Sequence, residues 1–262
     1  MNAPGLVTTP QRLPRSTGRQ ANLIAIASGK GGVGKTWLSI TLAHALTREG
    51  ARVLLFDGDL GLANVDVQLG LVGGRDLGML LRGDVAVQDV VQQTSAGFDV
   101  LAGRSGSGMF ASLADSAVDR LALLLAGTEG YSHVLLDLGA GLDRTVRRLA
   151  ATADTLLVVT TDEPTALTDA YAALKLAALD NPAGDRRIVV NLAASRTAGE
   201  KTYAALAHAA QKFLGARPPL AAVIRRDPRV PEAIRRQMPL LTRHPHSDAA
   251  GDVEGLARLL TS

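Results

Sequence analysis

A glycine-rich stretch near the start of the chain has the sequence Ser28-Gly29-Lys30-Gly31-Gly32-Val33-Gly34-Lys35-Thr36. It lies between an apolar run, residues 23–27, and a spacing of leucines and alanines that is typical of a helix. It fits the pattern G-x-x-x-x-G-K-[ST], in the strand-to-helix context that a phosphate-binding loop needs. Glycines let successive backbone N–H groups turn toward one anion, and the first turn of the helix adds its positive dipole end. The stretch therefore predicts a phosphate site.

The loop supplies most of the predicted nucleotide contacts. The Lys35 ammonium would reach the β- and γ-phosphates, and the Thr36 hydroxyl would coordinate Mg²⁺. Lys30 is a second lysine in the loop. From its spacing alone it could equally be a solvated surface lysine. The loop residues that we expect to contact the nucleotide are Gly29, Lys30, Gly31, Gly32, Val33, Gly34, Lys35, Thr36 and Trp37.

Two acidic residues follow apolar runs that are typical of buried strands. Asp59 comes just after the run 52–57, and Asp137 ends the run 131–137. The carboxyl ends of parallel strands meet at the edge of a sheet where ligands bind. We therefore expect Asp137 and the acid pair Asp57 and Asp59 to lie beside Thr36, where carboxylates can hold a hydrated Mg²⁺ and orient a water. An acidic turn is the alternative interpretation of residues 57–59.

A polar residue also ends the predicted strand 188–191. The side-chain amide of Asn191 offers one donor and one acceptor group, which matches the edge of adenine. The alternative is an asparagine that only shapes the turn after the strand.

Strand and helix patterns alternate along the chain. They predict a single α/β domain, residues 22–262, with a doubly wound, mainly parallel sheet flanked by helices. Residues 1–21 contain three prolines and are expected to form a flexible tail. No apolar run approaches the ~20 residues of a membrane span, and the first residues lack the apolar core of a signal peptide. We therefore expect a cytoplasmic protein.

Composition narrows the chemistry. The chain has no cysteine, which excludes disulfides and thiolate metal sites. The net charge of +3 does not by itself indicate nucleic-acid binding.

The loop form Lys30-Gly-Gly-Val-Gly-Lys-Thr36 resembles the deviant phosphate loop of the MinD/ParA ATPases. The resemblance implies a Mg²⁺- and ATP-dependent homodimer with slow ATP hydrolysis, in which Lys30 contacts the nucleotide held by the partner subunit as an arginine finger would. It also implies that Asp59 positions the water, that Asp137 supports Mg²⁺ and that Asn191 contacts the base. The absence of cysteine excludes the relatives that hold an iron–sulfur cluster.

A narrower similarity is carried by residues 57–66, 160–171, 189–192, 212–215 and 227–237. Through these segments the chain is most similar, within this group, to the FlhG/FleN branch, the regulators of flagellar number. That similarity implies an FlhF-type GTPase, flagellar switch proteins or a flagellar transcription activator as partners, at the inner membrane or cell pole as well as in the cytoplasm. Trp37 departs from the small polar residue usual there, which removes a side-chain contact to phosphate. Residues 1–21 lack the Asp-Gln-Ala motif that stimulates FlhF in relatives.

Other functions stay open at this point. A ParA-like DNA-partitioning ATPase would use the arginines of residues 225–236, although a solvated helix face is the preferred interpretation and DNA is not an expected partner. A MinD-like division-site ATPase belongs to the same class, and an anti-activator that only binds ATP would need no hydrolysis. Residues 252–260 share an apolar helical face but are short and acidic, so we expect them to pack on the core and membrane contact to be weak or indirect.

Overall fold

The computed structural model describes residues 21–59, 64–71, 77–82, 84–102 and 115–262. The predicted tail lies outside the described residues except for Ala21, which is buried. Residues 60–63, in the middle of the segment that follows Asp57, also lie outside them.

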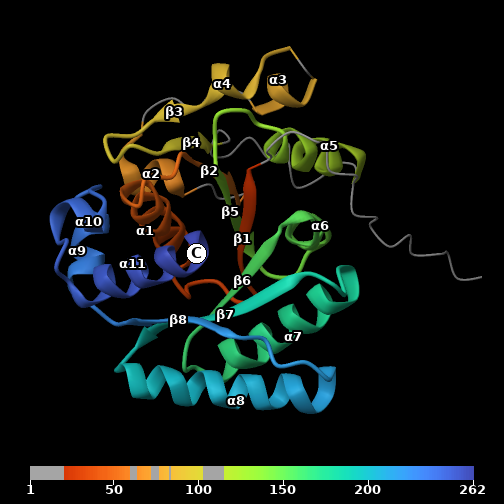
Figure 1. Ribbon diagram of the computed structural model, residues 1–262, viewed down its shortest axis with the longest axis vertical. Coiled ribbons are helices and arrows are strands. Elements are labelled where there is room, and N and C mark those ends of the chain that lie inside the picture. The colour runs from red at the N-terminus through yellow and green to blue at the C-terminus, as the bar shows by residue number, and fades with distance from the viewer. Residues whose placement is uncertain (1–20, 60–63, 72–76, 83, 103–114) are drawn as a thin grey trace, which may run out of the picture.

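The described strands form one eight-stranded sheet in the order β3-β4-β2-β5-β1-β6-β7-β8 (Figure 1). Neighbouring strands are parallel except β3, which is antiparallel to β4. This confirms the predicted doubly wound, mainly parallel sheet. The strands are β1 (Asn22–Ser28), β2 (Val53–Gly58), β3 (Gln92–Gln93), β4 (Asp99–Ala102), β5 (His133–Ala140), β6 (Thr155–Thr160), β7 (Asp185–Ala193) and β8 (Leu220–Arg225).

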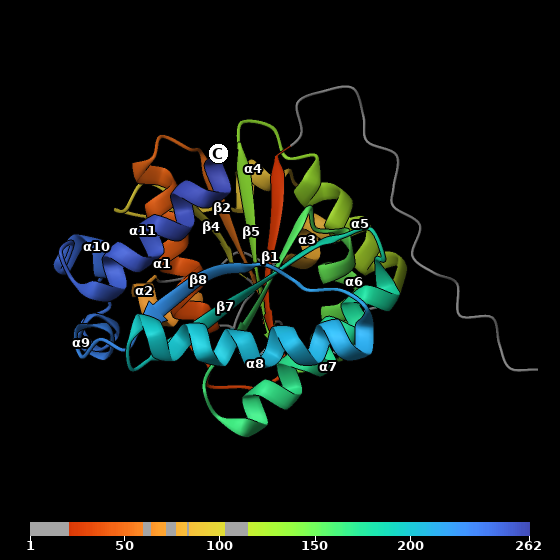
Figure 2. The same cartoon turned by 60° about the horizontal axis from the view of Figure 1, so that its bottom comes forward.

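Helices cover both faces of the sheet, with α1 and α11 on one side and α5 and α6 on the other (Figure 2). Successive side chains of a strand point to opposite faces. Ile24 and Ile26 of β1 accordingly join the core under α1 and α11, whereas Leu23 and Ala25 join the core under α6 and α7. The helices are α1 (Lys35–Arg48), α2 (Val65–Leu69), α3 (Leu77–Arg82), α4 (Val87–Val90), α5 (Asp115–Ala126), α6 (Arg144–Thr152), α7 (Pro164–Asp180), α8 (Arg196–Leu214), α9 (Arg229–Arg235), α10 (Leu240–Arg243) and α11 (Asp248–Thr261).

The last helix, α11, packs against α1 and β8. Val253, Leu256 and Ala257 are buried there, which confirms that this apolar face belongs to the core. The Asp252 carboxylate is also buried and accepts three hydrogen bonds from Arg225, one from its backbone and two from its guanidinium. Among the described residues, no helix combines the length and apolar character needed to cross a membrane.

His44 of α1 makes the fold sensitive to acid. Its ring is buried, and its Nδ1 atom has no hydrogen-bond partner. Burial, with a smaller effect from Arg48, lowers the pKa of His44 to about 4. Because the unfolded chain binds this proton near pH 6.5, the folded state holds fewer protons between pH 6.5 and 4, and stability falls as the pH falls through that window.

We predict that His44→Leu removes this part of the acid sensitivity. Between pH 7 and 4.5 the wild type should lose about 2 kcal/mol more unfolding free energy than the variant. Urea unfolding at both pH values measures the difference. His208→Leu, at an exposed position on α8, serves as the control. Equal acid losses in wild type and His44→Leu would contradict the prediction.

Candidate functional site

The glycine-rich loop joins the end of β1 to the start of α1 at the carboxyl edge of the sheet. Gly32 and Gly34 have φ angles of 81° and 87°, a left-handed conformation that side chains rarely adopt. Gly34 also caps the N-terminus of α1. The loop thus leads directly into the first turn of a helix, the arrangement that binds phosphate through backbone N–H groups.

Position 29 needs a glycine because the chain packs closely there, and not because of its backbone angles. A Cβ atom there would lie 2.3 Å from the backbone oxygen of Asp169 in α7. Gly31 is different, because a Cβ atom there would meet only the Ala140 side chain at 3.8 Å. The first glycine of the loop therefore fixes the distance between the loop and α7.

We predict that Gly29→Ala destabilises the nucleotide-free protein by about 1–3 kcal/mol, because backbone atoms must move to admit the methyl group. Gly31→Ala should change the unfolding free energy by no more than about 0.5 kcal/mol. Urea unfolding of the two variants tests the pair. A Gly29→Ala protein as stable as Gly31→Ala would show that α7 does not restrain the loop.

Lys35 lies almost fully inside the site. Its side chain donates a hydrogen bond to the Ser28 hydroxyl, with 2.9 Å between Nζ and Oγ. Burial lowers the pKa of Lys35, while Asp137 and Asp59 act in the opposite direction. The ammonium therefore faces two carboxylates, which brings three of the predicted site residues together.

Asp137 comes from the central strand β5, next to Asp57 of β2 in the sheet register. Its carboxylate accepts hydrogen bonds from the hydroxyls of Ser39, at 2.9 Å, and Thr36. Burial raises the pKa of Asp137 to about 6, although these hydrogen bonds and Lys35 favour its charged form. Thr36 and Asp137 are thus in direct contact, as the sequence predicts for residues that share a metal.

The Asp57 carboxylate binds backbone groups of the residues that follow it. It accepts backbone hydrogen bonds from Asp59 at 3.1 Å, Asn64 at 2.9 Å and Val65 at 3.0 Å. Burial raises the pKa of Asp57 to about 7, against the effect of these bonds. The carboxylate of Asp59 lies over Gly139, where a Cβ atom would be 3.7 Å from it. The two aspartates therefore have different surroundings: Asp57 accepts hydrogen bonds from the backbone that follows it, and Asp59 lies over Gly139 of β5.

The side chains of Thr36, Asp59 and Asp137 fit a Mg²⁺ ion that takes its other ligands from a nucleotide and from water. Magnesium usually takes one or two protein ligands together with phosphate oxygens and waters. Among the described residues, no group of three His, Asp or Glu side chains is arranged to hold a metal alone. Thr36, Asp59 and Asp137 offer a hydroxyl and carboxylates beside the loop, which fits that mode of binding.

Lys30 has other partners than Lys35. Its ammonium forms an ion pair with Glu163, at 2.5 Å, and hydrogen-bonds to the Thr165 hydroxyl at 2.9 Å. Lys30 lowers the pKa of Glu163. Both charged side chains are partly exposed, 35% for Lys30 and 61% for Glu163. In the single chain the predicted second lysine is therefore held at the surface by the first turn of α7.

Asn191 lies behind the loop. Its Nδ2 atom donates to the backbone oxygen of Val33 at 2.8 Å, and its Oδ1 atom is buried without a partner. The next residue, Leu192, has a φ of 55°, where the register of β7 and β8 shifts. Trp37, in the first turn of α1, is buried as well, and its indole N–H has no partner. Both side chains present unused polar atoms close to the loop.

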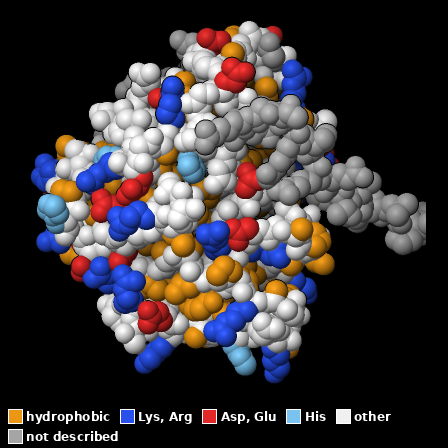
Figure 3. Space-filling view, viewed as in Figure 1, with side chains coloured by type: hydrophobic (Ala, Val, Ile, Leu, Met, Phe, Trp, Pro, Cys, Tyr) orange, Lys and Arg blue, Asp and Glu red, His pale blue; other side chains and the backbone are white. Residues whose placement is uncertain are grey.

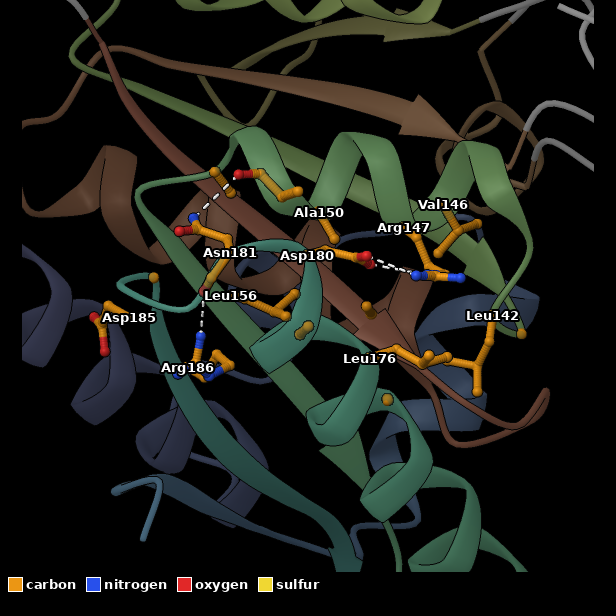
Figure 4. A pocket seen from close by; sticks show the side chains of 17 residues that line it. Leu142, Val146, Arg147, Ala150, Leu156, Leu176, Asp180, Asn181, Asp185 and Arg186 are labelled. Carbon is orange, nitrogen blue, oxygen red and sulfur yellow. Dashed lines mark hydrogen bonds and ion pairs between the residues drawn. The ribbon is translucent and has the colours of Figure 1, made fainter. Parts of the chain in front are cut away.

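A pocket between α6 and α7 lies next to this site but is not part of it (Figure 4). Leu142, Ala150 and Leu176 give it an apolar lining, and the Arg147–Asp180 ion pair spans its side. None of the predicted site residues lines it. The chemistry therefore belongs to the loop and the strand ends rather than to this pocket.

Comparison with known proteins agrees with this geometry. Residues 24–240 match the CobQ/CobB/MinD/ParA nucleotide binding domain. The chain belongs to this family. The predicted resemblance to MinD/ParA proteins is confirmed, and the family match shows that the chain carries a nucleotide binding domain.

Individual members of the MinD/ParA family show how far the similarity extends. Antiactivator FleN of Pseudomonas aeruginosa is 34% identical over 243 residues, which are 92% of this chain and 86% of FleN. Flagellum site-determining protein YlxH of Helicobacter pylori is 33% identical over 69% of this chain and 61% of its own length. The cell division ATPase MinD of Pyrococcus furiosus has a similar structure, with a TM-score of 0.77, 26% identity and coverage of 92% and 98% of the two chains.

Proposed function

We propose that this chain is an ATP-driven switch that regulates the number or placement of flagella. It binds Mg-ATP, forms a face-to-face homodimer, hydrolyses ATP slowly and releases its partners afterwards. The chemical part rests on one arrangement, in which Lys35 faces Asp59 and Asp137 beside a glycine-rich helix start. The flagellar part is supported by the similarity to antiactivator FleN along 92% of the chain.

Each site residue has a role in this proposal. The loop amides and Lys35 hold the phosphates, while Thr36, Asp59 and Asp137 hold the metal and its waters. The bound Mg²⁺ neutralises charge on the phosphates. Asp59 orients the attacking water, because its carboxylate lies over Gly139 and acts electrostatically on the Lys35 ammonium. The buried Oδ1 atom of Asn191 accepts a hydrogen bond from the base.

Lys30 acts across the dimer interface. Its present partner Glu163 is mostly exposed, and exposed ion pairs contribute little to stability. The lysine can therefore exchange this carboxylate for the more highly charged phosphates of the nucleotide in the partner subunit. An FlhF-type GTPase, flagellar switch proteins or a flagellar transcription activator are the proposed partners, in the cytoplasm or at the inner membrane or cell pole.

Trp37 gives a direct test of nucleotide binding. It is the single tryptophan of the chain and is buried next to Thr36. Because its indole lies in the first turn of α1, we predict that Mg-ATP changes its fluorescence saturably. Titration with Mg-GTP under the same conditions measures base selectivity. A flat signal with Mg-ATP, together with no binding by calorimetry, would remove the nucleotide site.

Counting flagella per cell by electron microscopy after deletion of the gene tests the biological role. Extra or misplaced flagella support the proposal. Normal flagella with misplaced septa would assign the chain to the role named for its MinD relatives, and loss of plasmid or chromosomal DNA would assign it to partitioning. Those two outcomes would leave the ATPase chemistry unchanged.

A further inference from the structure

Two exposed arginines at the end of α9 form no ion pair with any described residue, in contrast to Arg225. Arg225 is neutralised by Asp248 and Asp252. Arg235 and Arg236 are exposed, and neither forms an ion pair or side-chain hydrogen bond within the described part of the chain. Figure 3 shows several Lys and Arg side chains, with Asp and Glu side chains between them, on the side of the molecule that α9 and α10 form. This end of α9 is therefore a site of uncompensated positive charge.

Two apolar side chains lie beside these charges. Met238 directly follows the end of α9 and is 42% exposed, and Val67 of α2 is 57% exposed. A hydrogen bond joins the two elements, because Gln237 Nε2 donates to the backbone oxygen of Val67 at 2.8 Å. Single exposed apolar residues are common on protein surfaces, but here the backbone of Val67 is bound by the residue that directly precedes Met238.

The backbone at this junction is strained. Gln237 has a φ of 52°, one of two non-glycine residues among those described with a left-handed backbone. Such a conformation costs of the order of a kcal/mol and persists only where the surroundings impose it. The glycine after α2, Gly70, leaves room for the Gln237 side chain, since a Cβ atom there would lie 3.1 Å from its Oε1 atom. The contact between α2 and the end of α9 therefore depends on the conformation of Gln237 and on the glycine at position 70.

We propose that the α2–α9 surface, made of Val67, Arg235, Arg236, Gln237 and Met238, docks an acidic segment of a partner protein that carries apolar side chains. Carboxylates of that segment pair with the two arginines, and its apolar side chains cover Val67 and Met238. A flexible methionine suits such a surface because it adapts to different apolar groups. The inference goes beyond the proposed function and needs no ATP hydrolysis.

A protein segment fits this surface better than DNA does. Phosphates would pair with the arginines but leave Val67 and Met238 uncovered, because the duplex backbone is polar and charged. An acidic peptide with leucines satisfies both features, since apolar area at the centre and charge at the rim are usual in protein interfaces. The surface also includes α2, whose first N–H group is held by Asp57 at 3.0 Å. A docked peptide therefore contacts α2, the helix that follows Asp57 and Asp59 in the chain.

Fluorescence anisotropy with two synthetic peptides tests the proposal. Both carry the same Glu and Asp residues, and one has leucines where the other has serines. We expect the leucine peptide to bind the wild type at least about tenfold more tightly than the serine peptide, with or without Mg-ATP. We expect Arg236→Glu to weaken the binding of the leucine peptide by about tenfold, because a negative charge then faces the acidic peptide. Arg217→Glu, an exposed control before β8 at the other end of that strand, should leave it unchanged.

A second variant guards against a general charge effect. Met238→Ser should remove most of the preference for the leucine peptide while leaving the serine peptide unaffected. Equal affinities of the two peptides for the wild type, or equal losses in Arg236→Glu and Arg217→Glu, would overturn the proposal. Tighter binding of duplex DNA than of the leucine peptide at the same salt concentration would overturn it as well. Unchanged Trp37 titrations with Mg-ATP show that each variant keeps its nucleotide site.

Discussion

Lys35→Ala should reduce the affinity for Mg-ATP by about a hundredfold or more. The ammonium is the only buried positive charge that the structure places beside Asp59 and Asp137 among the described residues, and it is already inside the site before any nucleotide arrives. Charge-assisted hydrogen bonds to phosphate are about twice as strong as neutral ones, and this lysine is expected to contact two phosphates. Without it the two carboxylates also repel the incoming anion.

The nucleotide-induced shift in melting temperature measures this effect independently of the stability of the free variant. Mg-ATP should raise the melting temperature of the wild type, because a ligand that binds only the folded state stabilises it. The same concentration should leave Lys35→Ala unchanged. Lys201→Ala, at an exposed position on α8, is the matched control and should behave like the wild type. A wild-type shift in Lys35→Ala would assign the phosphate contacts to the loop backbone alone.

The sequence predicts the site well where a short motif fixes both the residue and the backbone around it. The phosphate loop leads into Lys35, the first residue of α1, and the two predicted acids come from neighbouring parallel strands, Asp59 directly after β2 and Asp137 from β5. The prediction that Asp137 ends its strand is wrong, because β5 continues to Ala140. Parallel topology imposes this convergence, since strands that run in the same direction bring their carboxyl ends to one edge. The positions of Asp59 and Asp137 therefore needed no knowledge of tertiary contacts.

The helix α6 shows where sequence patterns fail. It contains nine residues, of which only Val146 and Leu149 are buried, so its apolar periodicity is too weak to predict a helix. Its arginines instead pair with helices far away in sequence. Arg147 binds Asp180 of α7, and Arg148 binds Asp119 of α5. These partners become visible only once the chain is folded.

Two features of the site were likewise beyond the reach of the sequence. The resting contact of Lys30 depends on the approach of α7 to the loop, which the contact between Gly29 and Asp169 makes possible. The structural use of Asp57 depends on three backbone N–H groups that follow it. In the sequence Asp57 and Asp59 look equivalent, whereas the structure gives them different surroundings.

That difference leads to the second large prediction. Asp59→Ala should keep Mg-ATP binding but lower the hydrolysis rate by about a hundredfold or more, because water then lacks its orienting acceptor. Asp57→Ala should behave differently, because it removes the acceptor of the backbone hydrogen bonds from Asp59, Asn64 and Val65 and should lower the unfolding free energy by several kcal/mol. The two variants thus separate chemistry from folding at positions two residues apart.

The trapped state of Asp59→Ala can be seen directly by light scattering after size-exclusion chromatography. With Mg-ATP the variant should elute as a stable dimer, whereas the wild type should return to the monomer as ATP is consumed. Adding Lys30→Ala to Asp59→Ala should abolish the dimer, because the lysine that contacts the partner's nucleotide is then missing. Hydrolysis by Asp59→Ala at the wild-type rate would remove its proposed role. A dimer that survives Lys30→Ala would instead mean that Lys30 keeps its ion pair with Glu163 throughout the cycle.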